Sequence, residues 1–340
     1  MSTRSASERP NIRQVATTAG VSHMTVARVL NGHANIKEST RLKVLAAVEE
    51  LGYRPNIAAR ALATQKTLRL GAIVETETEL GPASALRAIH RAARLRGYSV
   101  SSIALDEEDS LDAGRAFEQL AGLGIDALCL VTPRSASVAA LRALSPDMPV
   151  LVVKPEREAE LLRVCVDQQL GVTMAVDHLA ALGHRDILHV SGPMDWLDAR
   201  ARERAFRARA RSWGMPERPI VAGDWSADFG YDFAISLQRR PDYTAIFAAN
   251  DQVALGLIHG LHDRGIRVPE DLSIVGFDDA AFSRHSIPPL TTVRQPFDAL
   301  GSAVVDVLLA AIEGRAIPQR TKIPPELIVR LSTAKARGAS

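Results

Sequence analysis

NIRQVATTAGVSHMTVARVLNG, residues 11–32, is the stretch that decides the fold of the N-terminal part of the chain. Apolar residues recur at helical spacing over its first nine positions, where Asn11 is a favourable N-cap and Gly20 can end the helix. Ser22 can cap a second short helix over residues 23–31. Two short helices around an Ala-Gly-Val-Ser turn are typical of a helix-turn-helix, and this is the fold that we predict.

A third helix is predicted from Glu38 to Leu51, with Gly52 at its end. We expect its apolar side chains to cover the first two helices and to complete a small core. These side chains are Leu42, Leu45, Ala46 and Val48. The sequence therefore predicts a three-helix head.

Basic residues gather in this head. Residues 1–66 hold ten Lys and Arg against four Glu, a net charge of +6, whereas the rest of the chain carries −4. A basic head on a mildly acidic body indicates a polyanionic partner for the head. In a helix-turn-helix the second helix lies in the major groove of DNA, and Arg28 is suited to a guanine edge. A solvated amphipathic helix can carry the same residues, but the turn and the charge together favour DNA. The candidate DNA-contacting residues of this helix are Ser22, His23, Met24, Thr25, Ala27 and Arg28.

The runs VATTAGVSHMTVARVLNG and KESTRLKVLAAVEELGYRPNIAARALAT closely resemble the lactose/galactose repressor (LacI/GalR) family. The resemblance implies a hinge helix over residues 56–63, ordered only on DNA, with Leu62 wedged into a minor-groove step. An eight-residue helix is marginal alone, and an apolar wedge kinks DNA, so the physics is compatible. Ala27 departs from the Ser of many members, and His23 and Met24 at specificity positions indicate an operator of its own. Further expected DNA contacts are Asn31, Tyr53, Asn56, Ala59 and Leu62.

From Leu68 onward, short β-branched runs alternate with amphipathic helices, which predicts an α/β fold of parallel sheets with helices on both faces. About 270 residues are too many for one such sheet, so two lobes are expected. LGHRDILHVSGP, GDWSADFGY, AIFAANDQVALG, VPEDLSIVGFDD and IPPLTTVRQP look like the family's landmarks in order. The resemblance implies a periplasmic-binding-protein-like core, its lobes joined by crossovers near Asp167, Gln295 and Pro324.

The expected organisation is thus a helix-turn-helix head, a hinge helix with its linker, and an effector-binding core made of two discontinuous lobes. The head spans 10–55, the hinge and linker 56–67, and the core 68–336. Within the core, we expect an N-lobe of 68–167 and 296–323, and a C-lobe of 168–295 and 324–336.

Several polar residues follow predicted C-lobe strands, at the sheet edge where open α/β folds bind ligands. An aromatic ring can stack on the C–H face of a sugar while planar polar groups bond its hydroxyls. Arg202, Trp225, Asn250, Asp278 and Gln295 have this chemistry, and each matches a sugar contact of the family as the resemblance implies. Plainer interpretations exist: a helix cap for Asn250, a solvated arginine face for Arg202 and core packing for Trp225. For the neighbouring Asp251 we favour helix capping. As a set, the five residues favour a small carbohydrate effector.

The N-lobe half of this site departs from the residues that the family resemblance implies. Glu75 stands where a small hydroxyl residue is expected, Val131 replaces a polar amide, and Lys154 replaces a carboxylate. The Leu80-Gly81-Pro82 turn is retained, so Glu75, Pro82 and Lys154 complete the candidate effector-binding residues. Trp225 favours a neutral sugar as the effector, whereas the positive charge of Lys154 is also compatible with a phosphorylated sugar. The sequence does not decide which sugar binds.

Other classes of protein have less support. A transport-type sugar-binding protein needs an export signal, which the N-terminus does not resemble, and no run approaches the ~20 apolar residues of a membrane span. The chain is therefore expected to be cytoplasmic. An enzyme or a metal site could use His178, His184 and His189 near Asp177 and Asp186, but no catalytic motif accompanies them. We expect no catalysis, no cofactor and no metal.

Two expectations concern thiols and partners. Cys129 and Cys165 lie in apolar runs, which indicates buried structural thiols. The partners expected are near-palindromic double-stranded operator DNA and a second copy of the chain, because each head reads one half-site. The chain ends without leucine heptads, so a homodimer is predicted. A nucleobase, a sugar phosphate or a phosphoprotein in place of the neutral sugar stays open.

Overall fold

A computed structural model describes residues 10–30, 35–53, 66–76, 79–105, 112–131, 134–144, 147–153, 161–237, 241–317 and 321–337. The chain divides after Thr67 into two compact units, and each is described by itself. Within the described residues, no helix is both long and apolar enough to span a membrane.

The first unit contains the three predicted helices, α1 (Ile12–Ala19), α2 (His23–Leu30) and α3 (Glu38–Glu50). The Asn11 side chain accepts hydrogen bonds from the backbone N–H groups of Arg13 and Gln14, and Gln14 Oε1 accepts one from the backbone N–H of Asn11. Gly20 follows α1 with φ of +65°, a left-handed conformation that glycine adopts without strain. The local signals at both ends of α1 therefore produce the turn that separates it from α2.

The core of this unit is formed by buried Val15, Val26, Val29, Val44 and Ala47. The prediction for α3 was wrong in phase, since Leu42, Leu45 and Ala46 are exposed. The helix instead turns Val44, Ala47, Val48 and Leu51 toward the core. These four positions follow the i, i+3, i+4, i+7 spacing of a single helical face.

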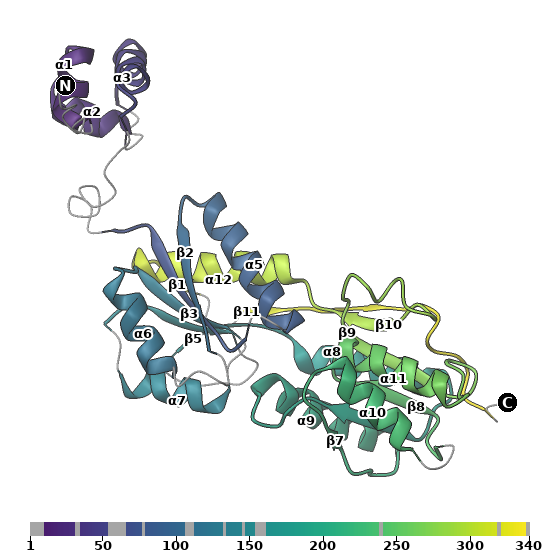
Figure 1. Cartoon of the computed structure of the whole chain (residues 1–340). Helices are drawn as coiled ribbons and strands as arrows, with labels where there is room; N and C mark the ends of the chain where they lie inside the picture. The colour runs from purple at the N-terminus through teal and green to yellow at the C-terminus, as the bar shows by residue number, and fades with distance from the viewer. Residues whose placement is uncertain are drawn as a thin grey trace, which may run out of the picture. The chain divides into compact units, whose positions relative to one another are not determined.

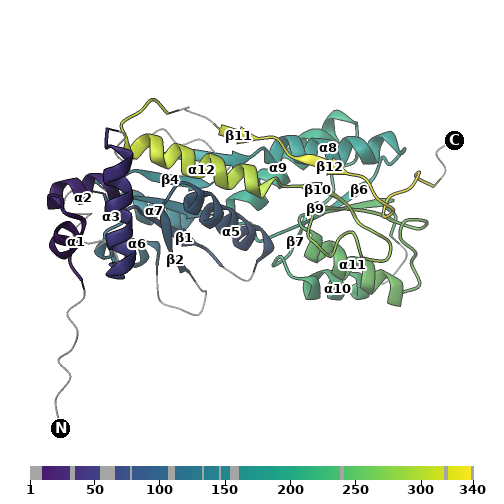
Figure 2. The ribbon, with the colours of Figure 1, turned by 90° about the horizontal axis from the view of Figure 1, so that it is seen from above.

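The second unit contains two six-stranded sheets (Figures 1 and 2). The N-lobe sheet has the order β11-β5-β4-β3-β1-β2 and is parallel in every pair. Its strands are β1 (Arg69–Val74), β2 (Ser99–Ala104), β3 (Ala127–Val131), β4 (Val150–Val153), β5 (Leu162–Val166) and β11 (Thr321–Ile323). One face packs against α5 (Leu80–Leu95) and α12 (Phe297–Ile312), and the other packs against α6 (Ala113–Gly122) and α7 (Ser135–Ala143).

The C-lobe sheet has the order β12-β10-β9-β8-β6-β7, and only its β10–β12 pair is antiparallel. Its strands are β6 (Ile187–Ser191), β7 (Val221–Ala222), β8 (Ala245–Ala248), β9 (Ser273–Asp278), β10 (Thr291–Arg294) and β12 (Glu326–Ile328). One face packs against α8 (Gln168–Ala181) and α9 (Leu197–Ser212), and the other packs against α10 (Ala227–Ser236) and α11 (Asp251–Asp263). In both views α10 and α11 lie side by side, as do α5 and α12.

The chain passes between the lobes three times: after β5, between β10 and α12, and between β11 and β12. Asp167, Gln295 and Pro324 lie on these segments. Leu80 and Gly81, expected as a turn, instead form the first turn of α5, with Pro82 at its third position. The limits proposed for head, hinge and lobes stay predictions, because residues 54–65 lie outside the described part.

Cys129 in β3 and Cys165 in β5 are free and buried, as the apolar runs around them indicated. Burial disfavours the thiolate and raises the pKa of Cys129 to about 12 and that of Cys165 to about 11. Both side chains are therefore protonated thiols at neutral pH.

Candidate functional site

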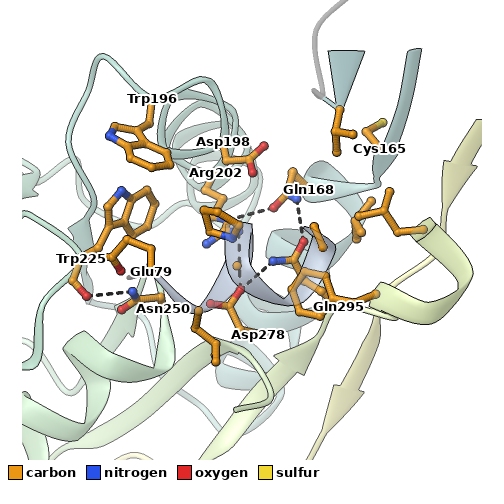
Figure 3. A pocket seen from close by; sticks show the side chains of 18 residues that line it. Glu79, Cys165, Gln168, Trp196, Asp198, Arg202, Trp225, Asn250, Asp278 and Gln295 are labelled. Atoms are coloured by element: carbon orange, nitrogen blue, oxygen red, sulfur yellow. Dashed lines mark hydrogen bonds and ion pairs between the residues drawn. The ribbon is translucent and has the colours of Figure 1, made fainter. Parts of the chain in front are cut away.

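A cavity lies between the two lobes and holds about 610 Å³ of space free of atoms, part of it open to solvent (Figure 3). Six of the eight predicted effector residues line it: Pro82, Arg202, Trp225, Asn250, Asp278 and Gln295. The remaining lining residues are Glu79, Leu80, Gly81, Ala85, Val153, Cys165, Val166, Gln168, Trp196, Asp198, Phe297 and Leu300.

Four side chains of the cavity form a closed ring of polar contacts. Arg202 Nε donates to Gln168 Oε1 at 2.8 Å, and Gln168 Nε2 donates to Gln295 Oε1 at 3.0 Å. Gln295 Nε2 then donates to Asp278 Oδ1 at 2.6 Å, and that oxygen lies 3.8 Å from Arg202 Nη2. Gln168 begins α8 beside the first crossover and Gln295 lies on the second. The ring therefore ties the cavity to two connections between the lobes.

Arg202 is 3% exposed, so it does not belong to a solvated arginine face. Its Nη1 donates to the carbonyl oxygen of Ala249, and its guanidinium lies 3.9 Å from the ring centroid of Phe277. A buried charge needs such partners to offset its loss of hydration. By contrast, Arg207 and Arg209 of the same helix pair with carboxylates nearer the surface.

Trp225 is held in a strained backbone conformation, with φ of +73°. Its ring lies against Gly192, where an added Cβ would overlap three ring carbons. Trp196 meets the ring edge-on, with centroids 5.9 Å apart and planes at 78°. Such strain in a buried non-glycine residue is typical of binding and catalytic sites. The indole is thus fixed at the cavity wall rather than packed in a lobe interior.

Asn250 caps α11, which is one of the two roles considered for it, and it also lines the cavity. Its Oδ1 accepts from the backbone N–H of Val253 as the N-cap of α11, while its Nδ2 donates to the carbonyl oxygen of Trp225 at 2.9 Å. The same side chain therefore caps the helix and fixes the tryptophan loop.

Asp251 does not cap α11, so the prediction for this residue was wrong. Its carboxylate is fully buried and accepts from Thr292 Oγ1, Ser283 Oγ and the backbone N–H of Ala280. Burial, with repulsion from Asp278, raises its pKa to about 7. Asp251 therefore connects the start of α11 with the loop after β9 and with β10.

Asp278 ends β9 with φ of 113°, another strained position that aims a polar group at the cavity. Burial raises its pKa to about 6, against the lowering effect of Arg202 and of the Gln295 hydrogen bond. The next residue, Asp279, faces away and pairs with Arg294 and Arg330. Of two adjacent carboxylates, only one belongs to the cavity.

Two lining carboxylates, Glu79 and Asp198, were missed from the sequence. Burial and repulsion from Asp224 and Asp278 raise the pKa of Glu79 to about 7, and burial raises the pKa of Asp198 as well. Asp198 lies four residues before Arg202 on α9, and this helical spacing was the signal that could have placed it on the same face.

Glu75, predicted to bind the effector, is not among the residues lining the cavity. Its Oε1 accepts from the backbone N–H of Arg134 at 2.8 Å. The Arg134 guanidinium then reaches the other lobe, where its Nε lies 3.4 Å from Asp195 Oδ2 and its Cζ lies 5.4 Å from the Trp196 ring centroid. Glu75 therefore positions a contact between the lobes. Lys154 lies outside the described residues.

Each of the three histidines considered for catalysis or metal binding has its own hydrogen-bond partners within the C-lobe. His178 contacts Thr333, His184 contacts Thr244 and the Ala334 carbonyl, and His189 contacts the Phe247 carbonyl. Burial lowers the pKa of each, and that of His189 to about 4. Within the described ranges no group of three or more His, Cys, Asp or Glu is arranged to hold a metal. Their contacts are those of structural residues.

In the head, the outer face of α2 presents His23, Met24 and Arg28 to solvent, with Thr25 and Ala27 half-buried. Ser22 caps the helix, because its Oγ accepts from the backbone N–H of Thr25 at 3.1 Å. Tyr53 packs against the core of the head. Asn31, Asn56, Ala59 and Leu62 lie outside the described residues. The exposed N-terminal end of α2 is the geometry that a recognition helix needs.

Comparisons with known proteins agree with this architecture. Residues 11–56 match the family model of bacterial regulatory proteins of the lacI family, and residues 176–333 match a periplasmic-binding-protein-like domain. The lactose operon repressor of Escherichia coli (strain K12) is 33% identical, over 94% of this chain and 89% of that protein. A lac repressor dimer bound to operator and the anti-inducer ONPF superposes with a TM-score of 0.85, at 30% identity over 96% of this chain and 100% of that chain. A complex of the regulator CelR with cellobiose gives a TM-score of 0.71, at 29% identity over 95% of this chain and 100% of that chain.

A helix-turn-helix head and a two-lobed core with a cavity between its lobes define a ligand-responsive DNA-binding transcription regulator. The chain belongs to the lacI family of bacterial regulatory proteins.

Proposed function

We propose that this protein is a dimeric repressor whose affinity for a near-palindromic operator is controlled by a small carbohydrate bound between its lobes. The observation that carries the proposal is the ring of Arg202, Gln168, Gln295 and Asp278 beside Trp225, in a cavity lined by both lobes. Planar amide, carboxylate and guanidinium groups can bond paired hydroxyls, and an indole can stack on the C–H face of a sugar ring. Of the relatives named above, one is the lactose operon repressor and another is the regulator CelR in complex with cellobiose.

The positions of the four hydrogen-bonded side chains explain how ligand binding can be coupled to DNA affinity. Gln168 and Gln295 lie at two of the three crossovers, so a ligand that hydrogen-bonds to them favours one relative orientation of the lobes. A change in lobe orientation alters the spacing of the two N-lobes in a dimer, and with it the segments that lead to the heads. A coupling free energy of about 1–3 kcal/mol changes operator affinity by ~5–150-fold. Release of DNA on ligand binding is the direction that we propose.

On DNA, Arg28 would contact a guanine edge while Ser22 and Thr25 contact phosphate or base edges. Asn31, Asn56, Ala59 and Leu62 remain proposed contacts of the head and hinge. The operator lies in the bacterial cytoplasm, and we place the protein there.

The test is a thermal-shift screen of mono- and disaccharides against full-length protein, Trp225→Ala and Trp213→Ala. Trp213 is the matched control, because it is 38% exposed and does not line the cavity. The expected result is stabilisation of wild type and of the Trp213 variant by one class of sugar, and none for Trp225→Ala. Stabilisation by a nucleobase and by no sugar would contradict the carbohydrate assignment.

A further inference from the structure

Trp196 gives the cavity a second aromatic wall. It precedes α9, is 5% exposed, lines the cavity and stands at 78° to Trp225 (Figure 3). One pyranose ring presents its apolar face to one aromatic plane at a time. Two indoles at nearly a right angle therefore offer contact to two separate rings of a ligand. Arg134 from the other lobe lies over Trp196 and holds this wall in place.

The same part of the cavity contains polar groups that the protein itself does not use. The side chains of Glu79 and Asp198 make no hydrogen bond to any residue that the structure describes, whereas Arg202, Gln168, Gln295 and Asp278 bond one another. The buried indole N–H groups of Trp196 and Trp225 also have no acceptor among the described residues. Unpaired buried donors such as these indole N–H groups are costly, and a ligand rich in hydroxyl groups would satisfy them and the half-buried carboxyl groups together.

The charged side chains that line the cavity favour an uncharged ligand. Arg202 donates through Nε to Gln168 and through Nη1 to the Ala249 carbonyl, and its charge is balanced by Asp278. Glu79 and Asp198 are then carboxyl groups of the described lining without a side-chain partner, and burial raises the pKa of each. When ionised they would repel a phosphate or a sugar acid, and in either protonation state they can form hydrogen bonds with the hydroxyls of an uncharged sugar.

We propose that Trp196 and Asp198 form a second subsite of the cavity, which takes the second ring of an uncharged disaccharide. The first sugar ring lies against Trp225 and against the four hydrogen-bonded side chains that include Arg202. This inference rests on the function proposed above and specifies the class of effector. It assigns to Trp196 stacking on the second ring, and to Asp198 acceptance of hydrogen bonds from its hydroxyls.

Calorimetric titration of the full-length protein tests the subsite with cellobiose, lactose and maltose, their components glucose and galactose, and glucose 6-phosphate. We expect one disaccharide to bind at least about tenfold more tightly than its component sugars, as stacking plus hydrogen bonds from a second ring provide. Asp198→Asn should weaken that disaccharide about tenfold and leave the monosaccharide unchanged. Trp196→Phe should weaken the disaccharide alone, and Trp225→Ala should remove both. Glu203→Gln, on the same helix but outside the cavity lining, is the matched control.

The outcomes separate the two proposals. Monosaccharides that bind as tightly as every disaccharide, a preference for glucose 6-phosphate, or equal losses for both ligands in Asp198→Asn would each overturn the second subsite. The carbohydrate function would survive the first and third of these results. If none of the six sugars binds, the proposed function and the subsite fail together. Unfolding midpoints without ligand identify any variant that fails to fold, and Asp198→Asn, a nearly isosteric change, then decides.

Discussion

Replacing Arg202 by Met should destabilise the core by about 3–4 kcal/mol at pH 7, because it removes one member of a buried ion pair. The substitution leaves Asp278 without its cation, and Gln168 Oε1 and the Ala249 carbonyl without their donor. The remaining hydrogen bond from Gln295 and partial protonation of Asp278 limit the loss. For a core of this size, the unfolding midpoint should fall by about 6–12 °C.

The loss should grow with pH, and the sign follows from linkage. Burial raises the folded-state pKa of Asp278 to about 6, so its carboxyl favours the folded state when protonated and loses this contribution as pH rises through that value. Arg202 lowers this pKa, so its removal moves the pKa higher and makes the ionised form costlier. The difference between wild type and Arg202→Met should therefore be larger at pH 8 than at pH 5.

Scanning calorimetry of the full-length protein, with the core transition followed separately, measures these differences. Arg211→Met is the matched control, because Arg211 lies on the same helix with a side chain 75% exposed and should cost less than about 0.5 kcal/mol. In Asp278→Asn no charge is stranded, so Arg202→Met should cost less in that background than in wild type. A loss under about 1 kcal/mol for Arg202→Met, or strict additivity of the two changes, would refute the ion-pair account.

Three further outcomes are expected. Gly192→Ala should lower effector affinity at least about tenfold, because its Cβ would displace the indole of Trp225 from the cavity wall. Gly81→Ala lies on the cavity wall with no atom near its Cβ, and it should leave the affinity measured by calorimetry unchanged. Burial raises the folded-state pKa of Asp251 to about 7, so its contribution to stability is complete below about pH 4 and is lost as pH rises through 7. In urea unfolding, wild type should therefore lose stability relative to Asp251→Asn between pH 5 and 8. A stability difference that stays constant over this pH range would contradict the prediction. Val44→Ala should destabilise the head by about 2 kcal/mol and Leu42→Ala by less than about 0.5 kcal/mol, as measured by chemical unfolding; equal losses would contradict the observed phase of α3.

The helices of the head were predictable where local chemistry decides them. Asn11 and Gly20 cap α1 through their own side-chain and backbone geometry, which the sequence displays directly. The face of α3 was not predictable, because apolar residues in LKVLAAVEEL occur on more than one side of the helix. Contacts with α1 and α2, which periodicity does not contain, select the face with Val44 and Ala47.

In the core, too, some elements were predictable from local sequence and others were not. Long apolar strands such as β3 and β9 were recognised, whereas the two-residue β7 and the three-residue β11 and β12 carry too little pattern to be distinguished from loops. In the cavity, Asn250 and Asp278 were found because they follow recognisable strands. Glu75 does not line the cavity, and its hydrogen-bond partner is a backbone N–H 59 residues further along the chain. Contacts of this kind depend on tertiary packing and have no local signal.

The central claim is that the cavity between the lobes and the affinity for DNA form one coupled system. Fluorescence anisotropy can test it with a near-palindromic duplex selected from a random pool, titrated with full-length protein with and without the sugar that stabilises it. The account predicts that the sugar weakens operator binding by ~5–150-fold in wild type and not at all in Trp225→Ala. Operator affinity that is identical with and without a saturating sugar would contradict it.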